Sequence, residues 1–272
     1  MCAVRGAKLT PLSGKNGLVD NAVAAYTNRM ALTFDTLSPS LGVRHDAFGN
    51  PVGKAVSDWH GCHRLPDATL VGRTCSVVPY DHVFAEGLFE EYAKDDGRMF
   101  AYLPFGPFGS DDELHDVIET WHKNRGLHTF VVVKDEHPIG HASFMRYDLP
   151  HGSVEVGGVT FSPVLQRTVM ATEAMYLMMT HAFDHGYRRY EWKCNQLNMP
   201  SNLAALRLGF TFEGVFRNAQ VSHESRRDTA WYSVIVEEWP QVKARLETWL
   251  DPSNFDADGE QKTALRDIPL TV

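Results

Sequence analysis

The fold is decided by residues 154–185, which read VEVGGVTFSPVLQRTVMATEAMYLMMTHAFDH. The first part alternates imperfectly, as a strand does, and the last part places apolar side chains along one side of a helix. A second strand, Arg189 to Cys194, and a short helix that Gly209 closes follow directly. This strand, crossover helix and second strand predict an α/β (mixed α+β) protein whose mixed sheet carries helices on both faces.

The turn between the first strand and the helix, SPVLQRT at 162–168, leads directly into the helix. Its backbone N–H groups are therefore expected at the positive end of the helix dipole. Unpaired N–H groups at the start of a helix bind anions. We therefore expect this turn to hold a phosphate.

Motifs in this stretch resemble the GNAT superfamily of acyl-CoA-dependent N-acyltransferases. The sequence QRTVMA at 166–171 matches the family's phosphate-loop pattern, except that Val169 replaces the first glycine. A β-branched residue does not adopt a positive φ cheaply, so ordinary backbone angles are expected at Val169. NMPSN at 198–202 and RLGF at 207–210 are similar to motifs of the ribosomal-protein N-terminal acetyltransferase branch. By motif order, the resemblance covers roughly residues 70 to 240.

The resemblance implies a central twisted sheet of six to seven strands, splayed in the middle where the thioester enters. Further strands are predicted from alternation and turn residues, at Leu70 to Val78, Thr129 to Lys134, Ile139 to Tyr147, Thr211 to Val221 and Thr229 to Glu237. Further helices are predicted after Asp81, from Asp111 to Lys123 and from Trp239 to Leu250.

Three segments are predicted along the chain: an N-terminal extension at 1–67, the GNAT domain at 68–250 and a polar tail at 251–272. The extension carries a predicted helix around Asp20 to Leu32 and an irregular connection from Leu41 to Pro66. Its first part is basic and poor in acids, so an organellar transit peptide stays open as an alternative. A role of the extension in assembly, as in a homodimer, also stays open.

The composition bounds the class of protein. Of the 272 residues, 43% are hydrophobic, and no run approaches the roughly 18 to 20 apolar residues that cross a bilayer. The net charge of -8 argues against a nucleic-acid partner, which would need a basic face. The four cysteines are too scattered for a disulfide framework. We therefore expect a cytoplasmic protein with no membrane or nucleic-acid partner.

The resemblance implies acetyl-CoA as the acyl donor. The family binds the pyrophosphate through the backbone of the strand-to-helix turn, which here comprises Gln166, Arg167, Thr168, Val169, Met170, Ala171 and Thr172. In the family the preceding strand carries a bulge and pairs with the pantetheine arm, so Val159 and Phe161 are expected contacts. The pair Gly157-Gly158 agrees with a bulge, with a ligand-free irregularity as the alternative. Asn198 is expected to bind pantetheine or to cap its helix.

Acetyl transfer to an amine needs a base and an aid to thiolate release. Glu155 is the candidate base, because a strand carboxylate takes this role in several members of the superfamily. An ordinary Glu has a pKa of about 4.3, so a catalytic Glu155 should be partly buried with a raised pKa. A Tyr usually assists release, but no Tyr lies between Tyr190 and Tyr232. Ser201 is the replacement candidate, with capping as its alternative role.

The acceptor pocket is expected opposite the cofactor, lined by Tyr102, Phe105 and Phe108 and by the hairpin around Ser222 to Thr229. Core packing is the alternative for these aromatic residues. No metal is predicted, because WHGCH at 59–63 with Cys75 lacks the second ligand pair of a structural zinc site. Cys194 is expected to be a buried inert thiol rather than a nucleophile.

These features predict an N-acetyltransferase that moves an acetyl group from acetyl-CoA to a primary amine by direct attack in a ternary complex. The acceptor could be a protein N-terminus, a polyamine or an aminoglycoside-like amine, because substrates diverge widely on one fold. The alternative is a non-catalytic acyl-CoA-binding or interaction domain with the same fold. Val169 and the missing Tyr favour that alternative.

Overall fold

The computed structural model describes residues 43–270, and the chain divides between Trp59 and His60 into two units. The predicted helix around Asp20 to Leu32 lies outside the described residues. In the first unit, β1 (Arg44–His45) and β2 (Pro51–Val52) pair as an antiparallel hairpin, within the segment expected to be irregular. Asp46 tightens its turn by accepting hydrogen bonds from the backbone N–H groups of Phe48 and Asn50.

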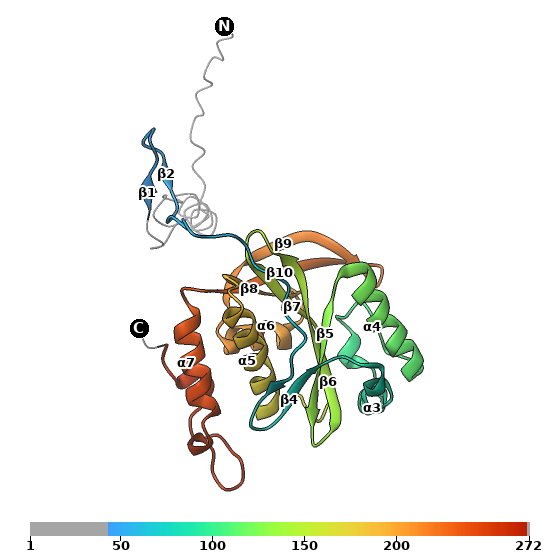
Figure 1. Ribbon diagram of the computed structural model, residues 1–272. Coiled ribbons are helices and arrows are strands. Elements are labelled where there is room, and N and C mark those ends of the chain that lie inside the picture. The colour runs from blue at the N-terminus through green and yellow to red at the C-terminus, as the bar shows by residue number, and fades with distance from the viewer. Residues whose placement is uncertain (1–42, 271–272) are drawn as a thin grey trace, which may run out of the picture. The chain divides into compact units, whose positions relative to one another are not determined.

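The second unit contains an eight-stranded sheet in the order β3-β4-β5-β6-β7-β8-β10-β9 (Figure 1). Its strands are β3 (Leu70–Val71), β4 (Ser76–Pro79), β5 (His128–Lys134), β6 (His137–Asp148), β7 (Ser153–Phe161), β8 (Arg189–Asn195), β9 (Thr211–Ser222) and β10 (Ser225–Ile235). Only β7 and β8 are parallel among these neighbours, because the crossover helix joins them. The mixed sheet is confirmed, with the two-residue β3 as one strand more than expected.

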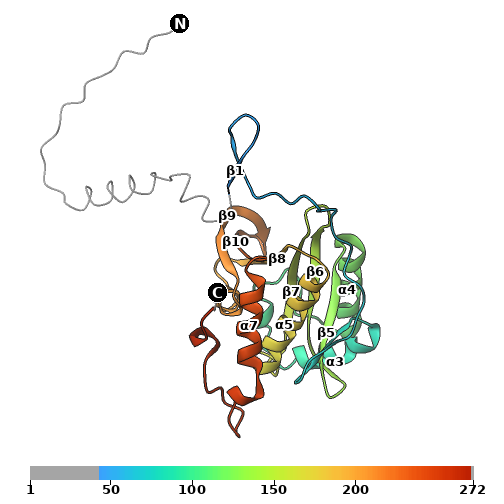
Figure 2. The same cartoon turned by 60° about the vertical axis from the view of Figure 1, so that its left-hand side comes forward.

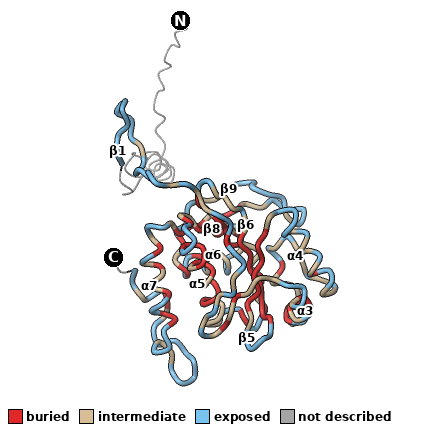
Figure 3. The backbone as a smooth tube through the Cα atoms, in the orientation of Figure 1, coloured by how far each residue is buried: buried red, intermediate tan, exposed pale blue. Residues whose placement is uncertain are grey.

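Helices cover both faces of the sheet, as predicted (Figure 2). They are α3 (Ala85–Tyr92), α4 (Asp111–Arg125), α5 (Val169–Asp184), α6 (Met199–Leu208) and α7 (Trp239–Leu250), with short 3-10 turns at His82–Phe84, Arg98–Phe100, Pro252–Asn254 and Leu265–Asp267. The larger core lies between the sheet and α5, α6 and α7, and a smaller one lies under α3 and α4. Figure 3 shows the buried segments gathered in the central strands and the inner sides of the helices.

Local sequence accounts for the helix boundaries. Ser110 begins α4 by accepting a hydrogen bond from Glu113 N at 3.1 Å, and Gly126 ends it with φ 62°. Gly209 ends α6 with φ 102°, as its position after the apolar run predicts. Among the described residues, no helix is both long and apolar enough to cross a membrane.

Long-range contacts change two expected elements. The strand predicted at Leu70 to Val78 is a hairpin, because the Glu173 carboxylate on α5 accepts hydrogen bonds from the backbone N–H groups of Arg73, Thr74 and Cys75 and folds the chain there. The expected polar tail after α7 folds back, and Leu265 is 1% exposed within the larger core.

The compact unit begins at His60, before the boundary predicted at Ala68. Residues 62–66 are bound to distant parts of the same unit. Cys62 N donates to Leu149 O at 2.8 Å, and Tyr187 OH donates to His63 O at 2.9 Å. These contacts join positions far apart in the sequence, so local pattern did not reveal them.

Candidate active site

The parallel pair β7–β8 opens halfway along its length. Its ladder runs from Ser153/Arg189 to Val156/Trp192. Beyond that point β7 pairs only with β6 and β8 only with β10, and none of the described ladders joins residues 157–161 to residues 193–195. The backbone edge of β7 after Val156 is therefore free to bind an extended ligand, as the splayed sheet predicted from the resemblance requires.

A bulge on β7 lies at this opening. The register slips by one residue between His141↔Thr160 and Ser143↔Gly157, and Gly158 has φ 59°. The neighbouring Gly157 leaves room for Met145, whose Sδ would lie 2.4 Å from a Cβ at that position. Glycine is therefore required at position 158 for its backbone angle, and at position 157 because a side chain there would clash with Met145.

Glu155 lies one residue before the last paired level, Val156/Trp192, on the face opposite the larger core. It is 5% exposed, and its Oε2 accepts from Lys193 Nζ at 2.6 Å and lies 3.2 Å from Arg146 Nε. Burial raises the pKa of Glu155, while the charges of Lys193 and Arg146 act in the opposite direction. The burial and the raised pKa expected of a catalytic Glu155 are both present, together with ion pairs that keep it charged.

Lys193 joins Glu155 to a second carboxylate. Its Nζ also donates to Glu191 Oε2 at 2.9 Å and lies 3.5 Å from the centre of the Trp231 ring. Glu191 in turn accepts from Arg189 Nε at 2.8 Å, which holds the pKa of Glu191 low despite burial. We call Glu155, Glu191, Lys193 and Arg189 the charged cluster.

The turn before α5 has the form expected of an anion site. Ser162 O accepts from Leu165 N and Gln166 N, and Thr168 Oγ1 caps the helix by accepting from Ala171 N at 3.2 Å. Val169 keeps an ordinary φ, as predicted, and the left-handed angle falls on Arg167 at φ 62°. No hydrogen bond is recorded within residues 43–270 for the backbone N–H groups of Arg167, Val169 and Met170. Three free donors within four residues at a helix start suit a phosphate.

The predicted cofactor residues therefore meet at one opening. Gln166 Nε2 donates to Phe161 O at 2.7 Å, which ties the turn to the end of β7. The predicted set around the turn is continuous from the end of β7 into the first turn of α5, comprising Val159, Phe161, Gln166, Arg167, Thr168, Val169, Met170, Ala171 and Thr172. These residues suit acetyl-CoA, because the free N–H groups match its pyrophosphate and the unpaired β7 edge matches its amide-bearing arm.

Asn198 and Ser201 both take part in capping α6. Asn198 Oδ1 accepts from Ser201 N at 3.2 Å, which is the capping role left open above. Ser201 Oγ accepts from Trp192 Nε1 at 3.1 Å, so its own hydroxyl proton is not used by that bond. Cys194 Sγ lies 3.3 Å from Asn202 Oδ1 and burial raises its pKa, which fits the inert thiol expected.

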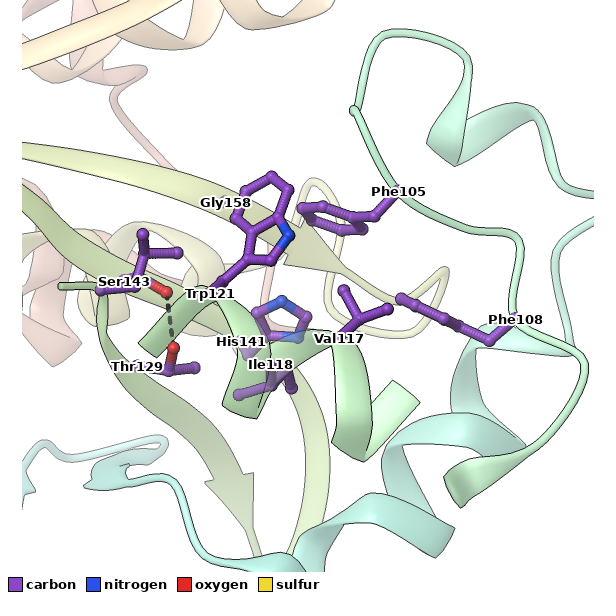
Figure 4. A pocket seen from close by; sticks show the side chains of 10 residues that line it. Phe105, Phe108, Val117, Ile118, Trp121, Thr129, His141, Ser143 and Gly158 are labelled. Carbon is purple, nitrogen blue, oxygen red and sulfur yellow. Dashed lines mark hydrogen bonds between the residues drawn. The ribbon is translucent and has the colours of Figure 1, made fainter. Parts of the chain in front are cut away.

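An aromatic pocket lies on the same sheet face as Glu155 (Figure 4). Phe105 and Phe108 line it as predicted, whereas Tyr102 does not. The rest of the lining was not predicted from the sequence. It comprises Val117, Ile118 and Trp121 from α4, Leu127 after it, Thr129 from β5, His141 and Ser143 from β6 and Gly158 from β7. The alternation of β6 could have placed His141 on this face, but no local motif marks it.

The predicted hairpin reaches the same region. His223, in the turn between β9 and β10, has its Nε2 2.9 Å from Leu103 O, so the hairpin contacts the loop that carries the aromatic residues. The two segments predicted to line an acceptor pocket are therefore adjacent.

The cysteines of the considered zinc site have protein partners. Cys62 Sγ donates to Gly186 O at 3.3 Å, and burial beside Glu173 raises the pKa of Cys75 to about 12. Within residues 43–270, no three His, Cys, Asp or Glu side chains are grouped to hold a metal ion.

Comparisons with known proteins agree with this geometry. Residues 78–211 match the acetyltransferase (GNAT) domain family. A GCN5-related N-acetyltransferase from Brucella melitensis is 34% identical, with 78% of this chain and 99% of that chain covered and a TM-score of 0.75. A GNAT-family acetyltransferase from Chromobacterium violaceum is 35% identical, with 70% and 98% covered and a TM-score of 0.65.

A curated relative is more distant. The ribosomal-protein-serine acetyltransferase of Escherichia coli is 28% identical over 109 residues, which is 40% of this chain and 60% of that protein. The match thus spans less than two thirds of that relative. Together the matches confirm the predicted fold and the predicted class, N-acetyltransferase, in a family that uses acetyl-CoA. The chain belongs to the GCN5-related N-acetyltransferase (GNAT) family.

Proposed function

We propose that this protein transfers an acetyl group from acetyl-CoA to a primary amine by direct attack in a ternary complex. One observation carries the proposal: the β7–β8 ladder opens after Val156/Trp192, one residue beyond Glu155 and beside the bulge at Gly158. The opening adjoins both an anion-binding helix start and a buried carboxylate. Donor and acceptor can therefore approach it from the two faces of the sheet.

The donor would be held by this chain's backbone. The N–H groups of Arg167, Val169 and Met170 would bind the pyrophosphate, and the β7 edge from Gly157 to Phe161 would pair with the pantetheine arm. When bound, acetyl-CoA supplies an activated thioester carbonyl. Arg167 is exposed at the turn and would add a charge-assisted contact to phosphate.

Glu155 would accept the proton of the acceptor ammonium, directly or through a water molecule. Its burial raises its proton affinity, and Lys193 and Arg146 keep it charged before the acceptor arrives. Ser201 would supply a hydroxyl near the sulfur as thiolate leaves, with Asn198 fixing the start of α6. Phe105 and Phe108, which line the aromatic pocket, would contact the acceptor.

The proposal covers more than one class of amine acceptor. The Escherichia coli relative is named a ribosomal-protein-serine acetyltransferase, and this name supports a protein N-terminus as one acceptor of this chain. The proposal has three further parts. Residues 68–250 form the catalytic domain, the protein is cytoplasmic, and the N-terminal extension forms a homodimer.

The test separates donor binding from turnover in the full chain. Acetyl-CoA is titrated calorimetrically, and free-thiol release is then followed against peptides, polyamines and aminoglycosides. Binding with amine-dependent release supports the enzyme. Binding without thiol release from any amine would favour the non-catalytic acyl-CoA-binding domain. The absence of acetyl-CoA binding would contradict both the enzyme and the binding domain.

A further inference from the structure

Arg227 is a half-buried cation on β10 that the proposed reaction does not use. Because side chains alternate along a strand, Arg227, Thr229 and Trp231 share one face of the sheet. The register identifies this face, since Trp231 pairs directly with Lys193 on β8. Directly paired residues point to the same side. The three side chains therefore lie on the face that carries the charged cluster.

Each of these three side chains holds a buried polar atom that has no hydrogen-bond partner within residues 43–270. The atoms are Arg227 Nε, Thr229 Oγ1 and Trp231 Nε1. Thr229 as a whole is only 5% exposed. Buried polar groups are nearly always hydrogen-bonded, and all three of these atoms can donate. A row of three unpartnered donors therefore suits a ligand group that is rich in oxygen atoms.

Arg227 also differs in charge balance from the other cations near Glu155. Lys193 Nζ and Arg146 Nε lie 2.6 Å and 3.2 Å from Glu155 Oε2. Arg227 forms no ion pair with any described residue, 43–270. Burial lowers the pKa of Arg227, while Cys194 and Glu155 act in the opposite direction. Arg227 is therefore near the proposed base without contacting it, and its charge is not balanced by a bound carboxylate.

The carboxylate next to Arg227 in the sequence is held elsewhere. Asp228 follows on the strand and so lies on the other face of the sheet. There it accepts from Arg226 Nε at 3.0 Å and Nη2 at 2.8 Å, and from the backbone N–H of Asn218 at 2.8 Å. The planar guanidinium of Arg227 matches a carboxylate of another molecule, to which it can donate two parallel hydrogen bonds.

The row of donors runs from the proposed base toward the turn between β9 and β10. At its inner end the Trp231 ring centre lies 3.5 Å from Lys193 Nζ, which donates to Glu155. At its outer end Arg227 is four strand residues further, a backbone distance of roughly 13 Å. It lies two residues after the start of β10, close to the turn that contacts the aromatic loop. An acceptor whose amine faces Glu155 can therefore extend along this row.

We propose that Arg227, with Thr229 and Trp231 as neighbouring donors, binds a carboxylate of the acceptor, so that the enzyme prefers amines that carry an acidic group. The guanidinium donates to the carboxylate while the amine faces Glu155. Two sources offer this group: an acidic side chain near a peptide N-terminus, or the terminal carboxylate of a small acceptor such as a dipeptide. Polyamines, which carry only cations, should be poor acceptors. This inference rests on the proposed function and adds the acceptor's charge.

The experiment compares acceptors that differ in one charge. The full-length protein is assayed by thiol release with two pairs: peptides with Glu or Gln at the second position, and a dipeptide with a free or amidated C-terminus. In one pair kcat/KM should favour the carboxylate roughly tenfold, the effect of a hydrogen bond to a charged group, and that pair identifies the source. In Arg227→Gln this ratio should fall to about one through a higher KM, with the affinity for acetyl-CoA unchanged.

A matched control removes the same charge from the other face of the strand. Arg226→Gln, next to Arg227 and paired with Asp228, should leave both ratios as in the wild type. Arg227→Lys keeps the charge without the planar fork, so it should retain only part of the preference, and it carries the test if Arg227→Gln does not fold. Equal use of both members of each pair by the wild type, or a ratio unchanged in Arg227→Gln, overturns the inference while the transferase stands. Absence of release from every amine overturns the proposed function and this inference with it.

Discussion

The sheet face that carries Glu155 has two halves that treat buried polar groups differently. On β7 and β8 the charged cluster keeps formal charges buried or half-buried, with both carboxylates paired to a lysine or an arginine. On β5 and β6 the aromatic pocket holds His141 without any charged partner in its lining. The bulge at Gly158 lies where the two halves meet.

The difference follows from what surrounds each group. Burial favours the neutral form of both Glu155 and His141, so it raises one pKa and lowers the other. The charge of Lys193 lowers the pKa of Glu155 in opposition to burial, whereas no charged group offsets the effect of burial on His141. The charged half is therefore suited to accept a proton, whereas the aromatic pocket keeps its histidine neutral. Three substitutions test this division, and a fourth tests the turn outside this face.

The largest effect is expected for the charged half. Glu155→Gln removes the proposed base and should lower kcat/KM by about 10²- to 10⁴-fold, with acetyl-CoA affinity unchanged in calorimetry. Glu191→Gln is the matched control, because it removes a carboxylate from the same cluster while leaving Glu155 in place. If both variants lose equal activity, the cluster has a structural role and Glu155 is not the base.

The second effect is on stability in the apolar half. His141 has a pKa of about 4 when folded and about 6.5 when unfolded, so the unfolded chain binds more protons between these values. The stabilisation is therefore present above pH 6.5 and is lost as the pH falls toward 4. Between pH 6.5 and 5 the wild type should lose about 2 kcal/mol through this group, and His141→Gln should not. Urea unfolding at the two pH values measures it, and equal losses would contradict a buried neutral His141.

The third effect is a shift of the pH profile. Lys193 lowers the pKa of Glu155, so Lys193→Met should raise that pKa further and move the acid limb of kcat/KM to higher pH. Arg146, Arg227 and Glu191 also influence Glu155 and remain in this variant. Lys243→Met removes a half-buried partner of Glu247 on α7, far along the chain from the charged cluster, and should leave the profile unchanged. If the acid limb of kcat/KM does not move in Lys193→Met, a group other than Glu155 controls it.

The smallest effect is expected outside this face, at the turn before α5. Arg167→Ala removes an exposed charge while the backbone N–H groups remain, so acetyl-CoA should bind about two- to fivefold more weakly. The loss should shrink as salt is added, because an exposed ion pair is screened. A loss that is large and independent of salt would indicate a distorted turn instead.

The sequence predicted those parts of the fold and site that depend on neighbours in the chain. The crossover from β7 to β8, the turn that leads into α5 and the ends of α6 follow from local pattern and turn chemistry. The pairing of Glu155 with Lys193 depends on the register of two parallel strands, and the pocket around His141 depends on how α4 packs on β6. Such contacts join distant positions, so composition and periodicity do not determine them.

The hydrogen bonds that Glu173 accepts from residues 73–75 hold the start of α5 and the turn before it in place. Glu173 lies in the first turns of α5, directly after the free N–H groups of Val169 and Met170, and it fastens that end of the helix to a hairpin a hundred residues earlier. The proposed coenzyme-binding turn is therefore anchored to the edge of the sheet. A substitution at Thr74, which lies outside the proposed site, should therefore change the affinity for acetyl-CoA.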